Sequence, residues 1–373
     1  MESYVILPTI DGGVLGTVRR FLGSLLEKKL VDVLLVPLEL PVGDNVVPTI
    51  VSSLEQIKAV NPLAPVMPVN TARLVSRITM VSPSPDKLGV VLRSCELRAL
   101  VELVKLKQAY LEKLLLIGID CYGTYPVDEY EKIARENLSP AEDFLNRVQE
   151  GKEDSLLRRA CQVCEYPAPT GADLTIGLIG ASLDKGILLT AGTQAGEKVI
   201  KELGLEEDGA EGRKPAIAKL IEERINKKEE MLKRTREEIS GKDKLMATLA
   251  TCINCHNCKT ACPLCYCKEC FFDSPVFEFG AEKYLDWAKR KGALRMPNDM
   301  LLFHLTRLNH MAISCVGCGL CTEACPNNIP VSDIFQLVGY QVQKMFNYVP
   351  GRSMEEELPL TTFKEEELTD IGM

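Results

Sequence analysis

Two closely similar cysteine motifs constrain this chain more than any other feature of its sequence. Each motif has the spacing C-x2-C-x2-C-x3-C followed by proline; their members are Cys252, Cys255, Cys258, Cys262 and Pro263, then Cys315, Cys318, Cys321, Cys325 and Pro326. This spacing is typical of proteins that hold two [4Fe–4S] clusters, where the fourth cysteine of each motif ligates the cluster of the other motif. The predicted ligand sets are therefore Cys252, Cys255, Cys258 and Cys325 for one cluster, and Cys262, Cys315, Cys318 and Cys321 for the other.

Zinc is the alternative metal, because paired C-x2-C half-sites also build zinc ribbons. A zinc ion would need only four of these eight thiols. It would explain neither the third cysteine of each motif nor the proline that follows the fourth. The pattern therefore favours iron–sulfur clusters, and two neighbouring clusters predict a protein that passes single electrons.

Length and composition describe an ordinary globular protein. The chain has 373 residues, of which 46% are hydrophobic and 26% charged, so we expect two or three domains with real cores. The net charge of −8 argues against nucleic acid as a partner.

The fifteen cysteines bear on the cellular compartment. The N-terminus lacks the basic stretch and apolar core of a signal peptide. The longest apolar runs, residues 31–38 and 114–119, are far shorter than the roughly 20 residues that a membrane helix needs. We therefore predict a cytoplasmic protein without membrane insertion, whose thiols are held by metal. Clusters of this kind also suggest an anaerobic host.

Residues 1–204 alternate between strand and helix patterns. Strands are expected at 4–8, 31–37, 88–92, 114–119, 172–180 and 187–190, and helices at 14–30, 72–78, 95–107 and 196–203. This alternation predicts an α/β domain with a sheet covered on both faces. Gly12 and Gly13 precede a predicted helix and form a candidate phosphate cradle, although two glycines more often mark an ordinary turn.

Residues 205–245 are crowded with Glu, Lys and Arg. They predict one long helix over residues 216–240, about 38 Å in length at 1.5 Å per residue, that joins two domains as a solvated strut. Acidic and basic residues are mixed along it, which disfavours a face for nucleic acid or membrane.

Residues 246–349 should form an α+β ferredoxin-like domain that holds both clusters. The gap between the motifs is long enough for a helical insert, with helices expected at 281–291 and 300–309. Cys265, Cys267 and Cys270 could hold a further metal or could be structural, reduced thiols. The acidic tail, residues 350–373, is expected to be extended, either wrapped on a partner or disordered.

Four other cysteines lie in the first half of the chain. Only Cys161 and Cys164, spaced as C-x2-C, suggest a metal by themselves. Cys95 and Cys121 each follow a predicted strand, and such cysteines are more often small buried hydrophobic residues.

With these features assembled, the chain resembles the β subunit family of F420-dependent formate dehydrogenase and F420-reducing hydrogenase. The matching segments are residues 262–270, 307–315 and 328–331, together with Arg93–Arg98, residues 117–121 and residues 159–164. The resemblance implies a third [4Fe–4S] cluster on Cys95, Cys121, Cys161 and Cys164, beside an FAD. It also implies flavin contacts at Asp11, Gly12, Gly13, Asn70, Thr71, Gly177, Gly180 and Gly186.

The resemblance implies an electron-transfer subunit of an oxidoreductase complex. FAD would exchange electron pairs with a soluble carrier, and the clusters would connect it to a catalytic partner such as a formate dehydrogenase α subunit or a hydrogenase subunit. The carrier could be F420, a nicotinamide or a redox protein, because residues 61–71 and Asp11 depart from the family pattern near the flavin. The alternative is an adaptor that relays electrons to a heterodisulfide reductase-like complex and has no soluble substrate of its own.

Overall fold

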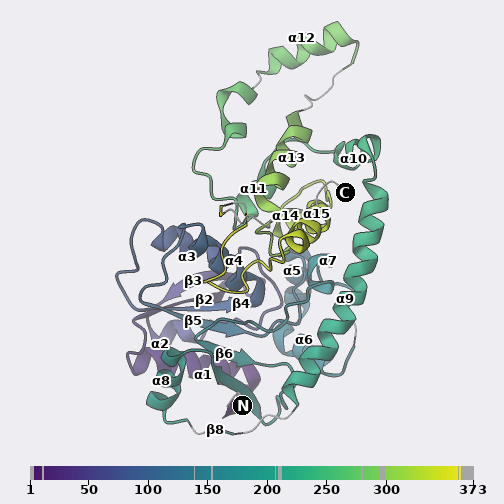
Figure 1. Cartoon of the computed structure of the whole chain (residues 1–373). Coiled ribbons are helices and arrows are strands. Elements are labelled where there is room, and N and C mark those ends of the chain that lie inside the picture. Colours follow the sequence, from purple (N-terminus) through teal and green to yellow (C-terminus); the bar gives the residue numbers. More distant parts are fainter. Residues whose placement is uncertain are drawn as a thin grey trace.

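A computed structural model describes residues 4–10, 12–137, 139–152, 154–205, 207–208, 212–278, 280–293, 299–359 and 361–362. The chain forms a broad α/β body, with the cysteine-rich half stacked on one side of it and α12 projecting at the far end (Figure 1). In the described part of the chain, no helix is both long and apolar enough to cross a membrane.

One eight-stranded sheet organises the first half of the chain. Its strands are β1 (Tyr4–Pro8), β2 (Val33–Glu39), β3 (Val46–Val51), β4 (Leu88–Arg93), β5 (Leu114–Ile119), β6 (Leu174–Gly177), β7 (Gly186–Ala191) and β8 (Glu207–Asp208). Their spatial order is β3-β2-β4-β5-β6-β7-β1-β8. β2, β4, β5 and β6 are parallel neighbours, and β3 and β7 pair antiparallel at either side of them. The carboxyl ends of the four parallel strands therefore meet at one edge.

Both faces of this sheet are buried, as the unbroken apolar runs in its strands require. The helices of this half are α1 (Gly13–Glu27), α2 (Leu54–Ile57), α3 (Thr71–Thr79), α4 (Ser94–Lys105), α5 (Val127–Glu136), α6 (Pro140–Gln149), α7 (Arg159–Gln162) and α8 (Gln194–Leu203). Side chains from α1, α6 and α8 share one core with alternate strand residues such as Ile117. On the opposite face, Leu116 belongs to a core built by α3, α4 and helices of the cysteine-rich half. The two halves thus share a hydrophobic core.

The cysteine-rich half is helical in its described residues. It contains α10 (Lys242–Leu249), α11 (Asn257–Ala261), α12 (Ala281–Lys291), α13 (Asp299–Met311), α14 (Leu320–Glu323) and α15 (Val331–Met345), with short 3-10 turns at Phe271–Asp273 and Pro275–Phe277. No strand of the sheet comes from this half where the structure describes it, so the expected α+β character is not seen there. The two cysteine motifs lie instead in loops that lead into α11 and α14.

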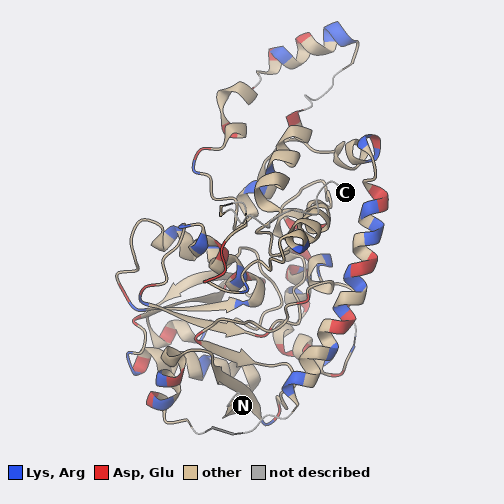
Figure 2. Cartoon of the chain, in the orientation of Figure 1, with Lys and Arg blue, Asp and Glu red and all other residues tan. Residues whose placement is uncertain are grey.

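The expected charged helix is present as α9 (Arg213–Glu238), and Figure 2 shows its mixed charges along the side of the molecule. It is less solvated than a strut would be. Arg213, Arg224, Met231, Leu232 and Thr235 are buried, and the helix packs along α15. The sequence pattern suggested a thin apolar stripe, whereas two of the buried residues are arginines that bind groups of the α/β half.

The first residues of the predicted tail bind their own chain. The buried carboxylate of Glu102 on α4 accepts hydrogen bonds from the Tyr348 hydroxyl at 2.5 Å and the Gly351 N–H at 2.9 Å. Arg98, one turn earlier, donates to the Pro350 carbonyl at 2.8 Å. Residues 363–373, including one of the two acidic runs, lie outside the described residues.

Most expected elements are confirmed to within a few residues, and several others were missed. The missed elements include β3, α5, α6, α10 and α15. β3 is an edge strand with Pro48 and an exposed Ile50, and α5 is a largely charged helix in which only Tyr130 is buried.

Candidate iron–sulfur sites

The sheet edge gathers the scattered cysteines of the first half. Cys95 lies in the first turn of α4, directly after β4, and Cys121 follows β5 by two residues. Cys161 lies in α7 and Cys164 follows it within the same loop. Because the carboxyl ends of neighbouring parallel strands meet at one edge, residues that are distant in sequence are brought together there.

All four of these cysteines line one cavity, with about 410 Å³ of empty space. Arg93, Arg158 and Arg224 also line it, as do Gly317 and Cys318 of the second motif. The arrangement matches the ligand set that the family resemblance implied, including Cys95 and Cys121, which the residues alone did not identify as ligands.

Arg158 supplies an independent test of whether this cavity suits an anionic cluster. Its side chain is buried, and its Nε and Nη1 have no hydrogen-bond partner. A buried guanidinium with unpaired donors is costly unless a negative group completes it. A cluster held by four thiolates would supply that charge, so the residues present fit the group.

Electrostatics differ among the four thiols. Burial raises the pKa of Cys121 to about 11 and that of Cys95 well above its ordinary value. Burial also acts to raise the pKa of Cys161, but Arg158 and the Thr124 hydroxyl outweigh it, and the pKa of Cys161 is lowered. Arg158 therefore favours the thiolate form of Cys161.

A second cavity contains one complete ligand set predicted from the motifs. Cys252, Cys255, Cys258 and Cys325 line it together, around about 330 Å³ of empty space. Cys325 comes from the other motif, so the cavity contains the crossed set and not the four consecutive cysteines of a single motif. His304 also lies here, with Nε2 3.4 Å from Cys252 Sγ. Burial lowers the pKa of His304 to about 4, which keeps its imidazole neutral near pH 7.

The remaining four motif cysteines are mutual electrostatic neighbours. Burial, then the charge of Cys262, raises the pKa of Cys318 to about 12. Burial is also the largest cause of the raised pKa of Cys321, followed by Cys318, Cys262 and Cys315. Cys262, from the first motif, therefore lies among the first three cysteines of the second motif, as the crossed pattern predicts.

Arg307 on α13 lies between these two sets. It is 3% exposed, and its Nη1 donates to Cys258 Sγ at 3.2 Å. Its strongest charge interactions are with Cys258 of one set and with Cys262 and Cys321 of the other. Neither Arg307 nor Arg158 is predicted from the sequence to act at a cluster, because arginine carries no spacing signal.

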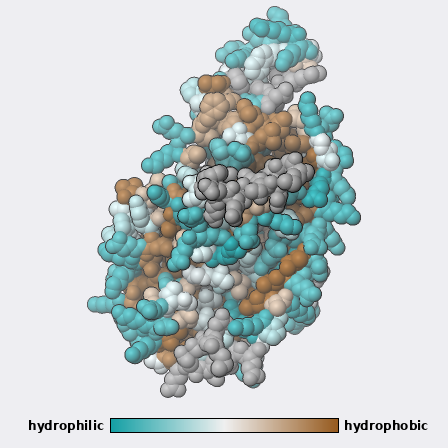
Figure 3. Space-filling model, viewed as in Figure 1, coloured by the Kyte–Doolittle hydropathy of each residue, from teal (hydrophilic) through white to brown (hydrophobic). Residues whose placement is uncertain are grey.

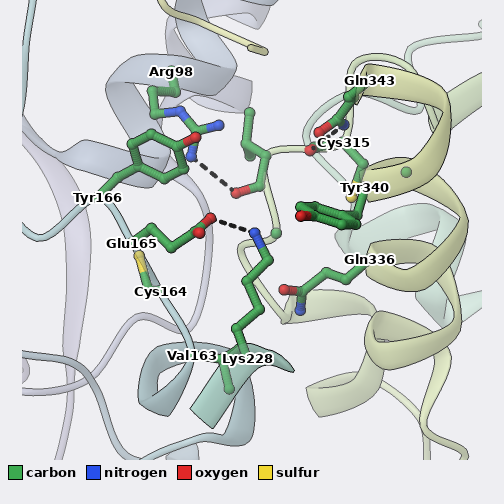
Figure 4. A pocket seen from close by; sticks show the side chains of 13 residues that line it. Arg98, Val163, Cys164, Glu165, Tyr166, Lys228, Cys315, Gln336, Tyr340 and Gln343 are labelled. Carbon is green, nitrogen blue, oxygen red and sulfur yellow. Dashed lines mark hydrogen bonds and ion pairs between the residues drawn. The ribbon is translucent and has the colours of Figure 1, made fainter. Parts of the chain in front are cut away.

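A small pocket adjoins the scattered set and the second motif (Figure 4). Cys164 and Cys315 both line it, and the Arg98 guanidinium lies 3.7 Å from the ring centre of Tyr166. Lys228 of α9 reaches in to pair with Glu165. Helix α9 therefore helps to fix the loop that carries Cys161 and Cys164.

The residues expected to contact flavin lie in two regions, the described glycines near the ends of β1, β6 and β7, and Asn70 and Thr71 at the start of α3. A Cβ at Gly177 or Gly180 would collide with Arg213, and one at Gly186 with the Leu7 carbonyl, so each glycine has a packing role. The carboxylate of Glu142 lies against Gly13, where a phosphate was envisaged, and Asp11 lies outside the described residues. Gly12, before α1, has a left-handed backbone with φ of 96°.

Asn70 and Thr71 begin α3, away from these glycines in sequence. Thr71 donates both its N–H and its hydroxyl to Glu96, at 2.9 and 2.7 Å, so its polar groups are used within the protein. Asn70 accepts from the Ala72 N–H, while its own Nδ2 is buried without a partner. Of the two, Asn70 alone has a donor left for a ligand.

A large groove lies beside the scattered cysteines, Cys95, Cys121, Cys161 and Cys164. It has about 1750 Å³ of empty space that includes open solvent. Gly180 lines it, as do Lys152, Lys219 and Lys227. Tyr122 and Gln162, each adjacent in sequence to a cysteine of the scattered set, form part of its wall. This groove is large enough for a dinucleotide and borders the cavity of the scattered cysteines.

Cys265, Cys267 and Cys270 have three different surroundings. Burial raises the pKa of Cys265 to about 11, although the nearby Arg307 acts to lower it. Cys267 is exposed, and Cys270 packs against an apolar cluster that includes Phe303. Among the described residues, no three or more His, Cys, Asp or Glu side chains are grouped closely enough to hold a single metal ion. A further metal on these three thiols therefore gains no support from their positions.

Comparisons with known proteins agree with this geometry. Residues 85–211 match the family model for the C terminus of the coenzyme F420 hydrogenase/dehydrogenase beta subunit, and residues 248–329 match a 4Fe-4S dicluster domain. The F420-dependent formate dehydrogenase subunit beta of Methanocaldococcus jannaschii is 28% identical, over 96% of this chain and 98% of that protein. Over nearly its whole length, this chain is thus similar to a β subunit of an F420-dependent dehydrogenase.

Two further similarities are more distant. The F420-dependent formate dehydrogenase 1 subunit beta of Methanococcus maripaludis is 27% identical, over 73% of this chain and 74% of that protein. A chain of the F420-reducing [NiFe] hydrogenase complex from Methanosarcina barkeri aligns with a TM-score of 0.45 and 16% identity, over 65% of this chain and 94% of that chain. The matched families make this protein an oxidoreductase subunit with a 4Fe–4S dicluster domain.

Proposed function

We propose that this protein is the electron-transfer subunit of an F420-linked formate dehydrogenase or a related hydrogenase. Three [4Fe–4S] clusters would be held by the crossed motif sets and by Cys95, Cys121, Cys161 and Cys164. When bound, the clusters would supply one-electron relays, and FAD would supply exchange between electron pairs and single electrons. The chain's own residues position these groups and set the charge around them.

The observation that carries this proposal is the continuity of the cysteine sites. The cavity of the scattered set has Cys318 in its wall, and Cys318 belongs to the next set. The set of Cys262, Cys315, Cys318 and Cys321 in turn approaches the set of Cys252, Cys255, Cys258 and Cys325 at Arg307. The charge of Arg307 acts on Cys321 of the former set and on Cys258 of the latter. Three sites in series give a path for single electrons across the molecule, which a structural zinc module would not require.

We place the flavin in the groove beside the scattered cysteines. Lysine side chains on its walls suit the negative pyrophosphate of a dinucleotide. Tyr122 and Gln162 would lie between the flavin and the cavity of Cys121 and Cys161. The groove's other side opens to solvent, so a soluble carrier such as F420 could reach it there.

The catalytic partner would bind at the opposite end, on the cysteine-rich half. Cys255 is exposed, next to Ile253, which is 54% exposed. Leu302 and Leu305 of α13 are also exposed, and Figure 3 shows apolar side chains gathered on this half of the visible face. Apolar surface beside an exposed cluster ligand suits an electron-transfer contact with another subunit.

Anaerobic purification with iron and flavin quantitation tests this function. We expect about twelve iron atoms per chain, four for each of three clusters, and one FAD. Added F420H2 should bleach the cluster absorbance near 400 nm, with NADH as the comparison. Iron and flavin without bleaching by either donor would favour the relay adaptor for a heterodisulfide reductase-like complex. Iron-free protein from oxygen-free cells would contradict the proposal itself.

A further inference from the structure

Helix α13 presents one face to the predicted clusters. Its buried residues recur at helical spacing and are Met300, Phe303, His304, Arg307 and Met311. Two of them are polar, and each reaches a thiol of the same ligand set: His304 lies beside Cys252, and Arg307 donates to Cys258. With the imidazole of His304 neutral, Arg307 provides the positive charge on this face.

The position of Arg307 is fixed by several contacts. Nη1 is 3.2 Å from Cys258 Sγ, and Nη2 donates to the Cys258 carbonyl at 3.1 Å. The guanidinium carbon lies 5.0 Å from the ring centre of Phe335 on α15 and 5.5 Å from that of Phe303. Its Nε is buried and has no partner. The aromatic rings limit the access of solvent to the Arg307 guanidinium, and its Nη1 is directed at the Cys258 thiol.

We propose that Arg307 sets the reduction potentials of the two motif clusters, raising that of the cluster on Cys252, Cys255, Cys258 and Cys325 the most. This inference rests on the cluster sites of the proposed function. Reduction adds one electron, and therefore one negative charge, to a cluster. A buried cation stabilises that added charge, and an N–H donor to a ligand sulfur has the same effect. Arg307 acts in both ways on the Cys258 set and by charge alone on the Cys262 and Cys321 set.

The alternative is that Arg307 has only a packing role between α13 and the first cysteine motif. In that case its replacement would weaken folding or cluster loading and leave the potentials of intact clusters unchanged. The two possibilities therefore differ in a measurement that does not depend on catalytic activity.

The test is a dithionite titration of the anaerobic full-length protein, followed by electron paramagnetic resonance. Dithionite supplies the electron that each cluster accepts. Arg307→Gln should shift the reduction equilibrium of one cluster at least tenfold toward the oxidised form, which is about 59 mV for a one-electron couple. A second cluster should shift less, and the third should not change. Arg307→Lys keeps the positive charge but loses the two parallel donors of the guanidinium. The reduction equilibrium of the cluster on Cys252, Cys255, Cys258 and Cys325 should therefore shift about threefold toward the oxidised form.

Lys259→Gln is the matched control, because it removes the same charge from the residue next to Cys258. The Lys259 amine pairs with Asp273 and is not directed at a sulfur. We expect it to leave all three potentials within the error of the titration. Equal shifts in Lys259→Gln and Arg307→Gln, or unchanged potentials in Arg307→Gln with its iron retained, would overturn the inference.

The lysine variant keeps the test decisive if Arg307→Gln loses a cluster. Fully loaded Arg307→Lys protein with unchanged potentials would also count against a role for the guanidinium fork. Wild-type protein that carries no iron would instead contradict the proposed function, which keeps the two failures distinct.

Discussion

The scattered cysteine site and the motif site of Cys252, Cys255, Cys258 and Cys325 are built in different ways. The motif site takes its ligands from two short loops that lead into small helices. The scattered site takes them from the ends of two strands and from a loop held by α9. A local loop depends on its own spacing, whereas a site at a sheet edge depends on the fold of the whole domain.

Burial follows the same division. Cys255 is exposed in the motif site, and Ile253 beside it is 54% exposed. The scattered site is walled by Arg158, which is 4% exposed, and Arg93, which is 6% exposed. The buried site suits an interior relay and the exposed one suits exchange with another protein. The following predictions test this contrast.

Removing crossed ligands should have the largest effect. Cys325→Ser should lose one cluster, about four iron atoms per chain. Adding Cys252→Ser should cause no further loss, because both belong to the same predicted set, whereas adding Cys315→Ser should remove about four more. Iron and sulfide analysis of the anaerobically purified variants measures this. Cys267→Ser, at an exposed thiol outside the sets, is the control and should keep its iron. A reversed pattern in the double variants would mean that each motif holds its own cluster.

Removing a buried ion pair between α9 and the α/β half should affect the scattered site more than the motif site. Arg213 of α9 and Asp120, next to Cys121, form a buried ion pair, in which Arg213 Nη2 is 2.9 Å from Asp120 Oδ1. Arg213→Ala would leave a buried carboxylate unpaired and should lower the free energy of unfolding by about 3–5 kcal/mol. Urea denaturation followed by circular dichroism measures this, and the scattered site should lose its iron first.

An exposed ion pair gives the comparison for that variant. The Lys58 and Glu55 side chains are 73% and 81% exposed, so Lys58→Ala should change stability by less than about 1 kcal/mol. If the urea midpoints of Arg213→Ala and Lys58→Ala were similar, the ion pair between Arg213 and Asp120 would not support the scattered site.

The smallest effect is expected where the two sites meet. Gly319 follows Cys318 with φ of 78°, and a Cβ there would lie 2.5 Å from the Ala160 Cβ, beside Cys161. Gly319→Ala should cost about 1–3 kcal/mol from backbone strain and should also push the two sites apart. Gly204→Ala is the matched control, since Gly204 has φ of 70° but no atom within 4 Å of its added Cβ.

Two readouts separate strain from displacement in this pair. Both variants should lose stability in urea, Gly319→Ala more than Gly204→Ala because of its collision with Ala160. Only Gly319→Ala should slow the passage of electrons between the sites in rapid-mixing experiments. Equal reduction rates in the two variants would argue that the close contact at Ala160 has no part in electron transfer.

The same contrast explains what the sequence could predict. The motif sets could be read from spacing, because each loop contains nearly all of its ligands. The strands and helices of the α/β half followed from periodicity, and so did α9. Cys95 and Cys121 could be assigned only through the family resemblance, because the sheet that brings them together joins strands far apart in the chain.

Other parts of the site left no pattern to read. Arg158 is followed directly by a second arginine and Arg307 is the only Lys or Arg of α13, and nothing in either segment distinguishes an arginine directed at a buried thiol from one in solvent. The glycines assigned to flavin, an assignment that stays a prediction, show the opposite difficulty. Gly177, Gly180 and Gly186 permit close backbone contacts with Arg213 and Leu7, a requirement that produces the same residue type as a phosphate loop.

The contacts of Glu102 have a consequence for shortened forms of the chain. This carboxylate is 0% exposed, and two of its donors, Tyr348 and Gly351, are made about 250 residues after it. A fragment that stops before Tyr348 would keep both cysteine motifs yet leave a negative charge with fewer partners inside α4. Early and late parts of the chain thus share one buried anion, and removing the residues from Tyr348 onward would expose that dependence as misfolding.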